Sequence, residues 1–140
     1  MSRENVEVVE AMFAGAATSE KEALRAALPE VIRQSCDPDI EWIEHLEHAD
    51  GRVYRGHEGV LESFERWLEQ WDEYGFEAER FIDCGDEVLV VAREHAQGMT
   101  SGVRVSSRIY SVLTMRAGKI ARYQEFYDEQ AALKAVGLAG

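Results

Sequence analysis

Residues 103–127 read VRVSSRIYSVLTMRAGKIARYQEFY, and they decide the fold. Two runs rich in β-branched and aromatic residues, 103–115 and 119–127, flank the turn signal Ala117-Gly118-Lys119. A connection this short requires the two strands to be antiparallel neighbours. The stretch therefore predicts one hairpin of an antiparallel sheet.

Two more runs upstream, 76–83 and 87–96, have the composition of strands. Turn signals at Cys84-Gly85-Asp86 and over 98–102 separate them from each other and from the hairpin. A shorter strand is expected over 40–45. The second half of the chain thus predicts four successive antiparallel strands.

The first half has helical periodicity instead. Apolar residues recur at helical spacing over about 2–16, and a second helix is expected from Ser19, where Glu22 completes a capping box. Pro29 is expected to kink or split this helix, and Asp37-Pro38 to end the helical region.

A third helix of about 15 residues gives the strongest periodic signal and is expected to end at Gly75. Its apolar stripe consists of Val60, Leu61, Phe64, Trp67, Leu68 and Trp71. A last helix is expected from an N-cap at Asp128 to Gly137. Helices first and strands later are typical of an α+β fold, and 140 residues have room for a single domain, 1–140, with one core.

The charge balance argues against two classes of partner. The 27 acidic residues outnumber the 15 basic ones, whereas nucleic acid and anionic membranes bind to basic faces. No apolar run has the length of a membrane span or the pattern of a signal peptide, and Cys36 and Cys84 do not form a disulfide framework. We expect no nucleic-acid or membrane partner and a location in the cytoplasm.

Several short motifs follow one another along the chain: Asp37-Pro-Asp-Ile-Glu-Trp42, Tyr54-Arg-Gly-His-Glu-Gly59, Gly85-Asp86-Glu-Val88, Ser101-Gly102, Gly118-Lys-Ile120 and the ending from Tyr127-Asp128 to Gly137. In this order and spacing the chain resembles the nuclear transport factor 2-like superfamily, and within it the SnoaL-like group of polyketide cyclases related to ketosteroid isomerase. The resemblance covers nearly the whole chain. It implies a cone-shaped, curved antiparallel sheet wrapped around N-terminal helices, a pocket between them, and often a homodimer packed through the sheet.

The resemblance also points to a carboxylate on the last strand. The position that matches the acid of SnoaL-like cyclases is Glu125, and the histidine just ahead of it in the family corresponds to Tyr123. Alternation along a strand puts Tyr123, Glu125 and Tyr127 on one face, where burial among rings would raise the pKa of the acid toward that of a general base. Alternatively, Glu125 faces solvent or pairs with Arg104 or Arg108.

Ketosteroid isomerase chemistry fits the residues less well. It needs a tyrosine on the first helix, a carboxylate base on the first strand and a protonated acid on a later strand. The first helix here has no tyrosine, and the place of the later acid falls near Ser111. Only Glu44 lies near the base position, which falls at or beside Ile43.

Arg93 and His95 are further catalytic candidates, because they share one face of the strand 87–96. At the mouth of a pocket they could hold a carbonyl or enolate and transfer a proton. The opposite register buries Val88, Val90 and Ala92 and turns both polar residues outward. Periodicity alone does not choose between these two faces.

Aromatic side chains are the candidates for the pocket wall, since aromatic walls favour planar, apolar ligands. The ligand-pocket candidates are Phe13, Trp42, Phe64, Trp67, Trp71, Tyr123 and Tyr127. Neither a cofactor nor a metal is expected. A metal site built from His45, His48 and His57 with Glu44 or Glu47 is the alternative, but the order His45-Leu-Glu-His48 is not that of a helical zinc site.

The sequence therefore predicts a SnoaL-like pocket protein that acts on a small hydrophobic molecule by cofactor-independent acid–base catalysis, as an isomerase, cyclase or lyase. The alternative is a non-catalytic ligand-binding or accessory dimerisation domain. A two-fold homodimer through the sheet is expected, because Ile109 or Tyr110, Val112 and Phe126 leave apolar groups on both faces of the sheet.

Overall fold

The computed structural model describes residues 2–18, 20–44, 52–98 and 102–138. Over these ranges the helices are α1 (Ser2–Ala16), α2 (Lys21–Ser35), α3 (Gly56–Leu68) and α4 (Glu129–Ala135). The strands are β1 (Cys36–Ile43), β2 (Val53–Arg55), β3 (Trp71–Cys84), β4 (Glu87–Gly98), β5 (Arg104–Arg116) and β6 (Lys119–Phe126). None of the described helices is long and apolar enough to cross a membrane.

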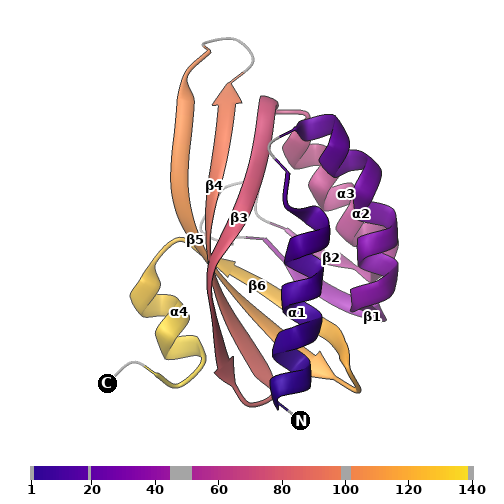
Figure 1. Ribbon diagram of the computed structural model, residues 1–140, viewed down its shortest axis with the longest axis vertical. Helices are drawn as coiled ribbons and strands as arrows, with labels where there is room; N and C mark the ends of the chain where they lie inside the picture. Colours follow the sequence, from indigo (N-terminus) through magenta and orange to yellow (C-terminus); the bar gives the residue numbers. More distant parts are fainter. Residues whose placement is uncertain (1, 19, 45–51, 99–101, 139–140) are drawn as a thin grey trace.

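The strands form one curved sheet in the order β2-β1-β6-β5-β4-β3. The four strands after α3 pair antiparallel as predicted, whereas β1 joins β6 in parallel. Figure 1 shows α1, α2 and α3 on one side of this sheet and α4 on the other. The α+β class and the curved sheet wrapped around the N-terminal helices are thereby confirmed.

Two apolar cores lie on opposite faces of the sheet. The main core, between the sheet and α1–α3, includes the fully buried side chains of Val9, Leu24 and Leu113. A smaller core lies under α4 and consists of Leu89, Val91, Tyr110, Val112 and Ala132. Because α4 covers Tyr110 and Val112 within the same chain, these residues do not supply the exposed apolar surface from which a dimer was expected.

The third helix is shorter than its apolar stripe suggested. It ends at Leu68, where the amide of Glu69 donates to the Glu65 carbonyl over 3.1 Å. Trp71 is the first residue of β3, and Gly75 lies inside that strand opposite His95. The long ladder between β3 and β4 fixes these residues in extended conformation and overrides the helical periodicity of the sequence.

The second helix also differs from its predicted form. Glu20, rather than Ser19, is its N-cap, and Ser19 lies outside the described residues. The helix continues through Pro29 instead of splitting, because Leu28 and Ile32 on either side of the proline are both buried in the main core. At the other end of the chain, Asp128 caps α4 as predicted by accepting from the Gln130 amide.

Candidate functional site

A cavity of about 230 Å³ opens between the concave face of the sheet and the helices α1 and α3. Its walls are mainly aromatic, and six of the seven predicted pocket residues line it: Phe13, Trp42, Phe64, Trp67, Tyr123 and Tyr127. The Trp42 ring stacks on the Tyr123 ring, with centroids 3.8 Å apart and planes 7° from parallel. Parallel pairing of β1 with β6 sets these two residues side by side.

Glu125 lines this cavity, as the alternation along β6 predicted. It lies opposite Ser111 of β5, and its Oε2 accepts a hydrogen bond of 3.0 Å from the Tyr123 hydroxyl. The Ser111 hydroxyl donates in turn to the Tyr123 oxygen over 3.0 Å. The candidate acid is thus held by a short chain of hydroxyl groups from two neighbouring strands.

The pKa of Glu125 is raised to about 7. Burial is the largest cause, because it penalises the charged form, and the negative charge of Glu94 comes next. Hydrogen bonds from Tyr123 and Tyr127 act in the opposite direction, since they stabilise the carboxylate. A carboxyl group with this pKa changes its protonation state near neutral pH, as a general base requires.

Glu94 is a pocket residue that the sequence analysis missed. It is 7% exposed, and its two carboxylate oxygens accept hydrogen bonds from Tyr74 (2.7 Å) and Tyr127 (3.3 Å). The register of β4 that buries Val90 and Ala92 turns Glu94 toward the concave face, but it is one of two registers that the sequence left open.

Arg93 and His95, expected at the pocket mouth, are not among the described residues that line this cavity. Both lie on the opposite face of β4 from Glu94, and neither lines the cavity that holds Glu125. Arg93 donates to the Ser106 hydroxyl (3.2 Å) and lies 3.7 Å from Glu79, whereas His95 is exposed and 3.8 Å from Glu77. Val88, Val90 and Ala92 lie in the main core on the concave side, and alternation along β4 places Arg93 and His95 on the other face of the sheet.

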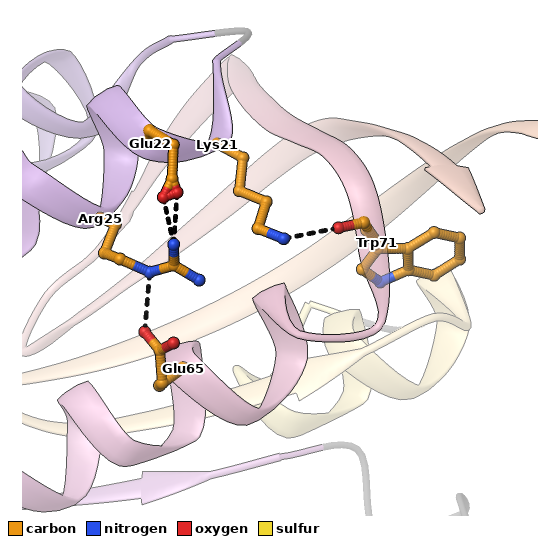
Figure 2. Close-up of polar contacts among 5 residues, drawn as sticks. All are labelled: Lys21, Glu22, Arg25, Glu65 and Trp71. Carbon is orange, nitrogen blue, oxygen red and sulfur yellow. Dashed lines mark hydrogen bonds and ion pairs between the residues drawn. The ribbon is translucent and has the colours of Figure 1, made fainter. Parts of the chain in front are cut away.

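Trp71 is the one predicted wall residue that does not line the cavity. Because it belongs to β3 rather than to α3, it packs behind Trp67, with ring centroids 5.5 Å apart. Its backbone carbonyl accepts a 2.8 Å hydrogen bond from the Lys21 ammonium, and Figure 2 shows this contact between α2 and the start of β3. Trp71 therefore packs against the wall residue Trp67 without lining the cavity itself.

Glu44 and Arg66 complete the charged lining of the pocket. Glu44 accepts from the Ser63 hydroxyl (2.8 Å) and from the Arg52 amide (3.2 Å), so it points inward rather than away. Arg66, on α3, donates to the Tyr54 hydroxyl over 2.6 Å. The described lining thus brings three carboxylates, Glu44, Glu94 and Glu125, together with one guanidinium.

The histidines do not gather around the pocket in the described part of the chain. The ring of His57 hydrogen-bonds through Nε2 to the Cys36 carbonyl (2.9 Å), while His45, His48 and Glu47 lie outside the described residues. Among the described residues, no group of three or more side chains is arranged to hold a metal ion.

The sequence profile of the SnoaL-like domain family matches residues 9–123. Among curated proteins, no sequence matches the chain. The fold is shared with an NTF2-like protein from Burkholderia thailandensis, which is 25% identical. That alignment covers 97% of each chain, with a TM-score of 0.75.

Two further solved structures share the fold and contain small molecules. One is TerC co-crystallised with polyporic acid, 24% identical over 95% of this chain and 98% of that chain, with a TM-score of 0.73. The other is a protein with a ketosteroid isomerase-like fold from Catenulispora acidiphila, in complex with trimethylamine. It is 19% identical over 94% of this chain and 93% of that chain, with a TM-score of 0.66.

Proposed function

Because the chain belongs to the SnoaL-like domain family, we propose that its pocket binds a small hydrophobic molecule and transfers a proton on it, with Glu125 as the general base. The observation that carries the proposal is the position of Glu125, whose carboxyl group lies among aromatic rings and has a pKa raised to about 7. No cofactor is needed for this chemistry, because the base and the hydroxyl donors all come from the chain itself.

The proposed step begins when the ionised Glu125 removes a proton from a carbon next to a carbonyl group of the ligand. The electron pair of the broken C–H bond moves to the carbonyl oxygen, which becomes an enolate. Hydroxyl groups or the Arg66 guanidinium in the lining can donate to that oxygen. Return of the proton at another carbon completes an isomerisation, while loss of a leaving group or attack of the enolate within the ligand gives a lyase or cyclase reaction.

The size and charge of the cavity limit the ligand. A dry apolar cavity of about 150 Å³ holds one benzene molecule, so a cavity of about 230 Å³ suits a molecule of one or two rings. Three carboxylates against one guanidinium favour an uncharged or cationic ligand over an anion. The small molecules bound by TerC and by the Catenulispora protein support ligand binding in a pocket of this fold.

Proton exchange on 2-tetralone, an uncharged two-ring ketone, tests the base assignment without knowledge of the natural substrate. In D₂O, a proton that a base removes from the carbon next to the carbonyl is replaced by deuterium from the solvent. Proton NMR follows the loss of the signal of that proton. The unmodified protein should catalyse this exchange. Glu125→Gln keeps the shape of the side chain but removes the proton acceptor, so the catalysed rate should fall by roughly 10²- to 10⁴-fold.

Glu62→Gln is the matched control, because Glu62 is an exposed glutamate on α3 outside the pocket. It should exchange 2-tetralone as fast as the unmodified protein. Binding is measured separately by quenching of tryptophan fluorescence, since Trp42 and Trp67 line the cavity. Equal exchange rates for Glu125→Gln and the unmodified protein, with 2-tetralone bound by both, would reject Glu125 as the base. If both rates also equal the rate in buffer alone, a non-catalytic binding domain is favoured.

We also propose that the chain forms a homodimer through the part of the sheet that α4 leaves uncovered. This surface includes Arg93 and Arg108, which both contact Glu79. Such polar contacts are compatible with an interface but supply less driving force than the apolar face that was expected. Light scattering at micromolar concentration tests this proposal, and a monomeric mass would reject it.

A further inference from the structure

We infer that Glu94 is a positioning residue for the proposed reaction: two tyrosine hydroxyls hold its buried carboxyl group in the wall of the same cavity as Glu125, where it controls proton transfer to and from Glu125. This inference rests on the proposed function and names a second residue that it requires. Glu94 does not need to touch the ligand, because it acts through Glu125.

The position of Glu94 on β4 is determined by contacts from β3 and from the residue just after β6. The residue lies on β4 opposite Phe76 of β3, and it is 7% exposed. The Tyr74 hydroxyl, from β3, donates to Oε2 over 2.7 Å, and the Tyr127 hydroxyl, just after β6, donates to Oε1 over 3.3 Å. Each carboxylate oxygen therefore has a donor, so the side chain is fixed in the wall of the cavity.

Both hydroxyl groups that contact Glu94 stay protonated at neutral pH. A carboxylate that accepts hydrogen bonds is stabilised relative to the neutral acid. Tyr74 remains a donor at neutral pH, because burial, and then the charge of Glu94, raise the pKa of its hydroxyl well above the ordinary value. The same causes raise the pKa of Tyr127, with the charge of Glu125 ranking ahead of that of Glu94.

Both carboxyl groups lie near the Tyr127 hydroxyl, which donates to Glu94 over 3.3 Å and whose pKa is raised by the negative charges of both Glu125 and Glu94. Two carboxylates that share a site in this way resist ionising together, so the second proton is released only at higher pH. When Glu125 accepts a proton from the ligand, the pair returns to a single negative charge. Relief of this repulsion favours proton transfer to Glu125.

The other charged groups in the described lining come from the residue just after β1 and from α3. Glu44, beyond the end of β1, also disfavours ionisation of Glu125, but its effect ranks behind that of Glu94. Arg66 on α3 lines the cavity and donates to Tyr54. The Tyr123 hydroxyl stabilises the Glu125 carboxylate and therefore acts against Glu94. After burial itself, Glu94 is the strongest factor that holds the proton on Glu125.

Glu94→Gln tests the inference, because glutamine keeps the length of the side chain and an acceptor oxygen but has no charge. The protonation of Glu125 is followed by NMR of ¹³C-labelled glutamate side chains, with Glu125→Gln used to assign its signal. We expect the proton affinity of Glu125 to fall roughly tenfold, which moves its titration midpoint down by about one pH unit. The pH dependence of 2-tetralone exchange should move down with it.

Glu44→Gln serves as the comparison inside the pocket and should give a smaller downward shift, whereas Glu62→Gln should give none. Glu94→Met, which is uncharged and of similar length, replaces Glu94→Gln if the glutamine variant does not fold. An unchanged Glu125 midpoint in the Glu94 variant overturns the inference, even if activity is lost, because the role of Glu94 would then be structural. If the Glu125 midpoint is already ordinary in the unmodified protein, the proposed function fails as well.

Discussion

At the scale of single residues, the chemistry of Glu125 depends on neighbours that act in opposite directions. Burial and the Glu94 charge raise its pKa, while the hydroxyl of Tyr123 lowers it. That hydroxyl also accepts from Ser111, so its oxygen is held at 3.0 Å from Glu125 on one side and from Ser111 on the other. The working pH of the pocket is therefore a balance among these few contacts.

Removing the Tyr123 hydroxyl should shift this balance upward. Tyr123→Phe keeps the ring that stacks on Trp42 but deletes the donor to Glu125, so the pKa of Glu125 should rise above about 7. The ¹³C titration of the glutamate side chains measures the change. Tyr110→Phe is the control, because Tyr110 lies under α4 on the other face of the sheet, and it should leave the midpoint in place.

The sequence predicted Glu125 and most of the aromatic wall, but not Glu94. Glu125 was found because Tyr123 and Tyr127 share its face and because the chain resembles a known family around it. Glu94 could not be found in the same way, since the run Val88–Ala92 is buried on both faces and offers no apolar–polar alternation. One face of β4 packs into the main core and the other packs against α4. Only the tertiary structure therefore shows which face points to the concave side of the sheet.

At the scale of elements, α2 is attached to α3 by a polar and an apolar layer. Figure 2 shows Arg25 of α2 between Glu22 of its own helix and Glu65 of α3, with Nε 2.9 Å from the Glu65 carboxylate. Beneath this layer, Leu24 is fully buried in the main core. The sequence predicted a helix in the place of α2, but no local pattern predicted the end of α3 at Leu68.

The two layers should differ strongly in their contribution to stability. Leu24→Ala leaves a cavity in the main core and should lower the free energy of unfolding by about 2–5 kcal/mol. Arg25→Ala removes partly exposed ion pairs, which are screened by solvent, and should cost far less than Leu24→Ala. Urea unfolding of both variants measures the difference. A larger loss for Arg25→Ala than for Leu24→Ala would contradict this account of how the helices are held.

At the scale of the whole molecule, burial of Glu125 makes the fold sensitive to pH. The folded protein holds the Glu125 proton up to about pH 7, whereas an unfolded chain releases it near the ordinary value of 4.5. Between these values the folded state binds more protons than the unfolded state, so the Glu125 contribution to stability falls as pH rises. A stability decrease over this window is the cost of placing an acid in an aromatic pocket.

Glu125→Gln should remove that decrease. Below about pH 4.5, residue 125 should contribute little to any difference in stability between the unmodified protein and the variant. The Glu125 carboxyl group is then neutral in both the folded and the unfolded state. Above pH 7 the variant should be the more stable, by an amount on the order of 3 kcal/mol. Chemical unfolding of both proteins at pH 4.5 and pH 8 measures the effect. A variant that is less stable than the unmodified protein at pH 8 would count against a buried, proton-retaining Glu125.

The protonation of Glu125 in the unmodified protein is the central claim, and one titration measures it directly. Glutamate side chains are labelled with ¹³C, and the carboxyl signal that disappears in Glu125→Gln is followed from pH 3 to pH 9. We predict a midpoint at about pH 7 for this signal. A midpoint near the ordinary value of 4.5 would show that Glu125 is solvated and already charged at neutral pH, and it would contradict the proposed base.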